Sequence, residues 1–255
     1  MVELKTDTSI DAMYEAGQVV AQALTAVREA ADVGVSLLEL DELAHDVLRR
    51  AGATSPFLGY RPSFAPVPFP AVLCASVNDA IVHGIPTGYR LRDGDLLSAD
   101  FGAELNGWAG DSALSFTVGT ARAADVRLVE TAERALAAGI EAAVVGNRIG
   151  DIAHAIGSVA RAAGYGIPQG FGGHGIGRRM HEDPPVPNEG RPGRGLRLRH
   201  GMVLAIEPML IASGNDGYHE APDGWTLKTN DRSRAAHAEH TVAITEAGPR
   251  ILTER

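Results

Sequence analysis

The 255-residue sequence predicts an α+β fold in which two pseudo-symmetric halves share one antiparallel sheet. Helical patterns followed by strand patterns occur twice along the chain, and the two halves align with each other. Residues 34–52 align with 146–164, which lie 112 positions later. Residues 91–100 align with 198–207, which lie 107 positions later. Two ordered matches at nearly the same offset indicate an internal duplication within a single domain. The halves correspond roughly to residues 1–120 and 121–255.

Two helices are expected at the start of the chain. Apolar residues recur with helical spacing through 8–31. Ser36 precedes Glu39 by three residues, which is a capping-box pattern and predicts that a second helix begins there. This helix should end near Arg50, because Gly52 follows it.

The rest of the chain alternates between loops, strands and a second pair of helices. Five prolines predict an extended loop at 55–70, a glycine-rich stretch covers 165–177, and a Pro/Gly/Arg-rich loop is expected at 184–197. The second helical pair is expected at 123–144 and 149–163. The segments expected to form strands are 71–77, 95–102, 110–118, 202–211 and 238–245.

Composition excludes several classes of protein. The chain has 23 Lys plus Arg and 32 Asp plus Glu, a net charge of −9, so we expect no specific nucleic-acid partner. Cys74 is the single cysteine and cannot form an intrachain disulfide. No apolar run approaches the roughly 20 residues that cross a bilayer, and no signal-peptide pattern opens the sequence. We expect a cytoplasmic monomer that does not associate with membranes.

Two aspartates in the first half should lie on one face of a hairpin. The Asn106-Gly107 pair predicts a two-residue turn, which places Asp111 opposite Gly102. Asp100 is two residues from Gly102 and therefore shares the face of Asp111. Two carboxylates buried together would repel each other, and at least one would become neutral unless a cation lay between them.

The second half repeats this arrangement of acids on apolar strands. Glu207 ends the apolar run 202–206, and Glu239 opens another strand pattern. A single acid at such a position is usually a hydrogen-bonding group at a strand end. Four acids in two duplicated pairs indicate divalent cations instead, because no Lys or Arg lies within 95–105, 202–211 or 238–245 to neutralise them. His174, between glycines, favours a borderline transition metal over calcium, and bridging carboxylates would hold two such ions.

Several short motifs resemble those of one enzyme family. In order along the chain they are Ser76-Val77-Asn78-Asp79 with His83-Gly84-Ile85-Pro86, Asp100 and Asp111 eleven residues apart, Gly173-His174-Gly175-Ile176-Gly177, His181-Glu182, Ile206-Glu207-Pro208-Met209, Gly224-Trp225-Thr226-Leu227-Lys228-Thr229, and Glu239-His240-Thr241. The ordered set resembles the type I methionine aminopeptidases, which adopt the pita-bread (creatinase/aminopeptidase) fold. The resemblance covers nearly the whole chain.

The resemblance implies removal of the initiator methionine from nascent or new proteins when the second residue is small. It implies two divalent ions, Co, Mn, Fe or Zn, with a bridging hydroxide as the nucleophile. Asp111 and Glu239 would bridge the ions, Glu207 would also move the proton, and His83 and His181 would contact the substrate and the tetrahedral intermediate. The five implied metal ligands are Asp100, Asp111, His174, Glu207 and Glu239.

Methionine selectivity requires an apolar pocket with soft or aromatic walls. Positions that match the family suggest Tyr60, Cys74 and Trp225, and more loosely Phe69 and Met180. The stretch 61–68 resembles an insertion beside this pocket.

Three alternatives remain open at this point. One is a proline-directed aminopeptidase of the same fold, and another is a non-catalytic pita-bread binding protein. The third is a nucleic-acid-associated factor that uses four arginines in the 184–197 loop and its continuation, although we expect this loop to be a solvated surface or at most a weak ribosome contact. These arginines are Arg191, Arg194, Arg197 and Arg199.

Overall fold

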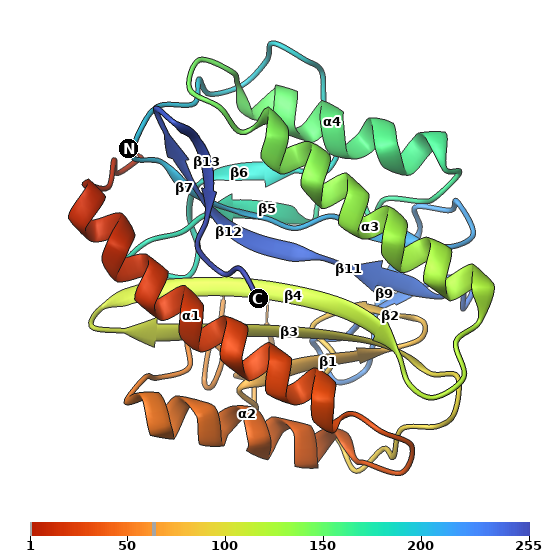
Figure 1. Ribbon diagram of the computed structural model, residues 1–255. Helices are drawn as coiled ribbons and strands as arrows, with labels where there is room; N and C mark the ends of the chain where they lie inside the picture. The colour runs from red at the N-terminus through yellow and green to blue at the C-terminus, as the bar shows by residue number, and fades with distance from the viewer. Residues whose placement is uncertain (1, 63–64) are drawn as a thin grey trace.

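Four helices pack against a central antiparallel sheet in the computed structural model, which describes residues 2–62 and 65–255 (Figure 1). The helices are α1 (Asp7–Ala30), α2 (Leu37–Ala51), α3 (Ala123–Ala142) and α4 (Ile149–Ala162). All four coincide with the expected helical segments, and the predicted α+β class is confirmed. Ser36 caps α2 through a capping box with Glu39, and Gly52 ends it in a left-handed conformation, as predicted.

The main sheet of the described chain has eight strands, and all of its neighbours pair antiparallel. Its order is β1-β3-β4-β12-β7-β5-β6, with β13 paired to β12. These strands are β1 (Leu73–Val77), β3 (Leu96–Leu105), β4 (Trp108–Thr117), β12 (Glu239–Thr245), β7 (Val203–Ile206), β5 (Gly172–Gly175), β6 (Glu182–Pro187) and β13 (Gly248–Ile251). Two small sheets contain β2 (Ala80–Val82), β10 (Leu227–Thr229) and β9 (Tyr218–Glu220), and β11 (Ala235–His237) with β8 (Met209–Ile211).

One expected loop is wrong at its beginning. The Pro-rich stretch predicted to be a loop at 184–197 starts inside β6, which pairs with β5. Because β6 is the last strand in the order of the sheet, its prolines need not donate to a neighbouring strand on the outer side. The expected strand at 202–211 is also divided into β7 and β8, since Glu207 and Pro208 interrupt it.

Matched backbone hydrogen bonds occur in the two halves. The isolated bridge Ser36↔Arg90 has a counterpart in Arg148↔Arg197, and Thr54↔Glu104 has a counterpart in Gly166↔Ile211. The first partner is displaced by 112 positions and the second by 107 in each case, which are the two offsets found in the sequence. In Figure 1, α1 and α2 lie over the β1–β3–β4 part of the sheet, and α3 and α4 lie over the other part.

The β3–β4 hairpin has the predicted register. Gly102 pairs with Asp111, and the turn residues Asn106 and Gly107 have positive φ angles of 53° and 78°. Both angles are those of a hairpin turn whose twist matches the strands. Asp100 and Asp111 are therefore a diagonal pair on one face of the hairpin, as expected.

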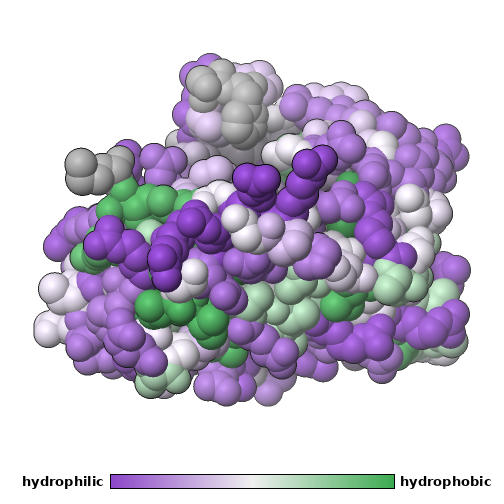
Figure 2. Space-filling view, turned by 90° about the horizontal axis from the view of Figure 1, so that it is seen from above, coloured by the Kyte–Doolittle hydropathy of each residue, from purple (hydrophilic) through white to green (hydrophobic). Residues whose placement is uncertain are grey.

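Two large apolar layers hold the helices against the sheet. One includes Leu24, Leu40 and Phe101 below α1 and α2, and the other includes Leu128, Ile152 and Leu204 below α3 and α4. Polar residues separate small apolar patches on the face shown in Figure 2. No helix in the described part of the chain is long and apolar enough to cross a membrane.

Helix α1 approaches β4 closely through two glycines. A Cβ at Gly110 would lie 3.0 Å from the backbone nitrogen of Gly17, and a Cβ at Gly17 would lie 2.2 Å from the carbonyl oxygen of Leu252. Because Asp111 follows Gly110, this contact helps to fix the strand that carries one of the candidate ligands.

Replacing Gly17 by alanine should destabilise the protein. Alanine is favoured over glycine in a helix by about 1 kcal/mol, but the methyl group would displace the Leu252 carbonyl, and overpacking of this kind costs about 1–3 kcal/mol. Because the methyl group would contact backbone rather than a flexible side chain, the steric term should win. We expect Tm to fall by several degrees in thermal unfolding followed by circular dichroism. Gly88→Ala is the control, since nothing lies within 4 Å of its Cβ position. An unchanged or raised Tm for Gly17→Ala would contradict this packing.

Candidate metal centre and active site

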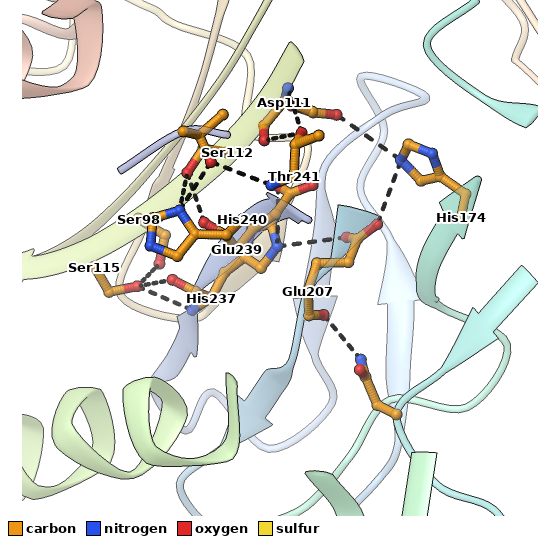
Figure 3. A network of polar contacts seen from close by, with 12 residues as sticks. Ser98, Asp111, Ser112, Ser115, His174, Glu207, His237, Glu239, His240 and Thr241 are labelled. Atoms are coloured by element: carbon orange, nitrogen blue, oxygen red, sulfur yellow. Dashed lines mark hydrogen bonds and ion pairs between the residues drawn. The ribbon is translucent and has the colours of Figure 1, made fainter. Parts of the chain in front are cut away.

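The structure brings the five predicted ligand residues to one cavity of about 370 Å³. Asp100 lies in β3, Asp111 in β4, His174 in β5 and Glu239 at the start of β12, while Glu207 directly follows β7. Figure 3 shows Asp111, His174, Glu207 and Glu239 directed toward one another. The cluster therefore draws on strands from both halves of the chain.

Strand register explains why the acids meet. Ala113 in β4 pairs with Asp100 on one side and with Glu239 on the other. Asp111 is two residues from Ala113 and shares its face, so the three acids lie on adjacent strands. His174 pairs with Ala205, two residues before Glu207.

Close packing of the backbone surrounds His174 at its two flanking glycines. A Cβ at Gly173 would lie 2.1 Å from the carbonyl oxygen of Ala205, and one at Gly175 would lie 2.1 Å from that of Asp183. Side chains larger than hydrogen cannot be accommodated at either position without moving the backbone. The imidazole between them is thus held at a defined depth.

Burial of three carboxyl groups is electrostatically costly. Asp100, Asp111 and Glu239 are 9%, 4% and 1% exposed. Burial raises the pKa of Asp100 to about 7, and burial together with the neighbouring acids raises the pKa values of Asp111 and Glu239 well above their usual range. Each of the three has one buried oxygen that receives no hydrogen bond from the described residues.

Glu207 behaves differently from the other acids. Burial alone would raise its pKa, but His237 and His174 outweigh burial and lower it. His174 Nε2 lies 3.6 Å from Glu207 Oε1 and 3.8 Å from Asp111 Oδ2, and His237 Nε2 lies 3.4 Å from Glu207 Oε2. Glu207 is therefore the acid of the cluster that is best kept ionised at neutral pH.

Sequence reasoning missed His237. It is 1% exposed, and its ring nitrogen also lies 3.9 Å from Glu239 Oε2. The available signal was its position two residues before Glu239, since alternate residues of an extended segment share a face. The predicted strand began at 238, so the sequence did not indicate that residues 235–237 form the strand β11 directly before β12.

The donor set fits divalent cations. Ligand atoms of Asp111, His174 and Glu239 lie within 4.8 Å of one another, and so do those of Asp100, His237 and Glu239. Within residues 2–62 and 65–255, no Lys or Arg forms an ion pair with these acids. Unpartnered carboxylate oxygens next to imidazole nitrogens are the ligands that borderline transition metals prefer.

Two further histidines face the same cavity, and both are neutral at pH 7. Burial lowers the pKa of His83 to about 4, and burial with the neighbouring His174 lowers the pKa of His181 to about 4, although His181 as a whole residue is exposed. The His181 ring stacks on Tyr60 with centroids 5.4 Å apart. His83 has a positive φ of 59°, a conformation that a non-glycine residue adopts at an energetic cost and often at functional sites.

Aromatic and sulfur-containing side chains form the walls of the cavity. Tyr60, Cys74 and Trp225 line it, and so does Phe69, whose ring lies 5.2 Å from that of Trp225. Met180 does not line it but packs behind the wall, where its methyl group lies against Gly102. Sequence reasoning missed three aromatic or sulfur-containing lining residues, which are Phe57, Phe171 and Met209.

The stretch 61–68, expected as an insertion beside the pocket, includes residues 63 and 64, which lie outside the described residues. Of its described part, the Val67 carbonyl accepts a hydrogen bond of 2.9 Å from Trp225 Nε1, and the Pro66 ring lies against Gly224. This stretch therefore contacts the pocket wall at Trp225.

Fold and site together are those of a metallopeptidase, and the model of metallopeptidase family M24 matches residues 11–246, so the chain belongs to this family. It is 53% identical to methionine aminopeptidase 1 of Mycobacterium tuberculosis, over 99% of this chain and 95% of that protein. The crystal structure of methionine aminopeptidase from Thermotoga maritima superimposes with a TM-score of 0.95 at 37% identity, covering both chains completely. The resemblance to type I methionine aminopeptidases, and with it the pita-bread fold, is confirmed.

A more distant match shows the fold alone. Prolidase from Pyrococcus furiosus superimposes with a TM-score of 0.77 at 23% identity. The match covers 99% of this chain but only 65% of the prolidase chain.

Metal-free protein should become less stable as the pH rises from 7 to 8.5. Asp100, Asp111 and Glu239 have pKa values raised in the folded state, so the folded protein binds their protons more tightly than the unfolded chain. Stability from such groups is fully present below their unfolded pKa of about 4 and is lost as the pH passes their folded values. Chelator-treated samples would be melted across this pH range.

Between pH 7 and 8.5 the histidines contribute little to the change in stability. His83, His181 and His240 have lowered pKa values, so their opposing effect appears only as the pH falls through the unfolded value of about 6.5. Asp100→Asn should flatten the slope of Tm against pH. A metal-free wild type whose Tm is flat or rises over this window would show that the acids are not in the costly environment described.

Proposed function

We propose that the protein is a metal-dependent aminopeptidase that removes the initiator methionine from peptides and proteins whose second residue is small. The observation that carries this proposal is a buried cluster of carboxylates, with oxygens that lack donors, at one side of an apolar cavity that also holds two neutral histidines. Family membership supports the same reaction.

Two divalent ions, Co, Mn, Fe or Zn, would be held by Asp100, Asp111, His174, Glu207 and Glu239. The ligand atoms form two groups that share Glu239, which supports two ions held by these residues. When bound, such ions supply Lewis acidity and lower the pKa of a coordinated water. All further steps are assigned to groups of the chain itself.

Glu207 is the group that would move the proton. The two imidazoles beside it keep its pKa low, so its carboxylate can accept a proton from the attacking water. The same group would then donate that proton to the nitrogen of the leaving amine. This cycle returns Glu207 to its ionised form after each turnover.

His181 and His83 would donate hydrogen bonds to the substrate. A neutral imidazole carries one N–H, and both rings line the cavity beside the acid cluster. We assign His181 to the oxygen that gains charge in the tetrahedral intermediate and His83 to the nitrogen of the scissile bond. Stacking of His181 on Tyr60 would limit its rotation.

The walls of the cavity suit a methionine side chain. Cys74 and Trp225 are each 5% exposed, and with Tyr60 they offer soft and aromatic surfaces to an unbranched thioether. The free amine of the substrate would approach the acid cluster, which explains selection for an N-terminus.

Several wider properties remain predictions. We propose a single catalytic domain formed by duplication, acting as a cytoplasmic monomer. Four arginines in the 184–197 loop and its continuation have exposed side chains, and we assign them at most a weak ribosome contact. These arginines are Arg191, Arg194, Arg197 and Arg199.

The peptidase proposal is tested with three tripeptides. Metal-loaded protein should release methionine from Met-Ala-Ser, a chelator should abolish release, and added Co²⁺ or Mn²⁺ should restore it. Leu-Ala-Ser should react about 10–200-fold more slowly, since a hydrophobic pocket discriminates similar side chains by about that factor. Faster release of alanine from Ala-Pro-Ser would favour the proline-directed alternative. No release with any metal would favour a binding protein.

His181→Ala should lower kcat by about 100-fold, because loss of one donor to a developing oxyanion has an effect of that size. Metal content per chain, measured by atomic emission, should not change. His154→Ala in α4 is the matched control, since this histidine is exposed and lies outside the cavity. Loss of metal from His181→Ala, or full activity, would refute the assigned role.

A further inference from the structure

A second imidazole faces the acid cluster from the side opposite His174. We propose that His237 Nε2 is a sixth metal ligand, which completes the ion site formed by Asp100 and Glu239. This inference rests on the proposed metal centre but adds a ligand that the family motifs did not indicate. Each of the two ions would then have one imidazole.

Distances around the two histidines support this assignment. His237 Nε2 lies 3.4 Å from Glu207 Oε2 and 3.9 Å from Glu239 Oε2. His174 Nε2 lies 3.6 Å from Glu207 Oε1 and 3.8 Å from Asp111 Oδ2. Ligand atoms about 2.1 Å from one ion, at tetrahedral angles, lie about 3.4 Å apart. Ligand atoms of Asp100, His237 and Glu239 all lie within 4.8 Å of one another, as do those of Asp111, His174 and Glu239, so each histidine is within reach of an ion shared with two acids.

The ring nitrogen of His237 lies beside Glu207 but has no hydrogen-bond partner among the described residues. Nε2 is buried and makes no hydrogen bond of acceptable geometry with any residue that the structure describes. Figure 3 shows the ring directed at Glu207 from the side away from His174. A buried imidazole nitrogen that approaches carboxylates without hydrogen-bonding to them is costly unless a ligand uses it.

Neighbouring strands hold the backbone of His237 in place. Ser115 Oγ accepts a 2.9 Å hydrogen bond from His237 N and donates a 2.8 Å bond to its carbonyl oxygen. Ser98 and Ser115 are joined by their hydroxyls at 2.7 Å. In β11, His237 also pairs with Met209 of β8. The ring is thus presented by backbone that is fixed on both sides.

A second imidazole would change which metal the centre favours. Sites built only from carboxylates suit Mg²⁺ and Mn²⁺, whereas imidazole suits zinc, iron and other borderline metals. With one nitrogen ligand in each group, both ions would be drawn from the borderline class.

X-ray absorption of the wild-type protein loaded with two equivalents of Zn²⁺ tests the proposal without any variant. Two histidines shared by two ions should give an average of one imidazole per zinc. With His174 as the only histidine ligand, the average would be one half. The second result would overturn the proposal.

His237→Gln provides the second test, because glutamine retains a hydrogen-bond donor but is a poor zinc ligand. Competition with a zinc chelator should show that one of the two sites binds Zn²⁺ at least about 100-fold more weakly than in the wild type. Residues that only support a ligand lower the affinity by about 10–100-fold, so the loss should reach at least the upper end of that range. His240→Gln is the matched control. This histidine is next to Glu239 but hydrogen-bonds to Thr253, and its variant should keep both sites.

The outcomes separate this inference from the proposed function. If His237→Gln binds two Zn²⁺ with unchanged affinity, His237 only donates to Glu207 and the inference fails while the metal centre stands. If the wild type itself binds no Zn²⁺, the metal centre fails as well.

Discussion

Mutual repulsion among buried carboxyl groups is the constraint on which the rest of this structure depends. Asp100, Asp111 and Glu239 occupy adjacent strands at no more than 9% exposure, and burial raises all three pKa values. The described chain places no Lys or Arg in an ion pair with them. Either protons or metal ions must therefore neutralise the cluster. Its unpartnered oxygens and nearby imidazoles favour metal ions.

A division of charge follows from the same geometry. Glu207 lies between two imidazoles and keeps a lowered pKa, whereas His83 and His181 remain neutral donors with pKa values of about 4. The proposed function thereby assigns proton transfer to Glu207, which also belongs to the ligand set, and stabilisation of the intermediate to the neutral histidines. The aromatic wall at Trp225 and Tyr60 supplies the apolar part that a methionine side chain requires.

Much of the fold could be predicted, because local chemistry determined it. The capping box at Ser36 and the Asn106-Gly107 turn depend on neighbouring residues, and the turn alone determined the register of Asp111. Strand β6 was mistaken for a loop, since its prolines are tolerated only because it lies at the sheet edge, which is a property of the tertiary structure. The role of His237 was not predicted for a related reason, because its distance to Glu207 depends on pairing between strands far apart in sequence. Likewise, the sequence could not reveal that Met180 packs behind the cavity wall.

Anomalous diffraction at the cobalt edge, from crystals equilibrated with Co²⁺, is the most direct test of the central claim. Two anomalous peaks should appear among the carboxylates, each about 2.0–2.3 Å from ligand oxygens of Asp100, Asp111 or Glu239. A well-folded protein that shows no peak in this cluster at any Co²⁺ concentration would contradict the account. The acids would then be neutralised by protons, and the proposed chemistry would have no basis.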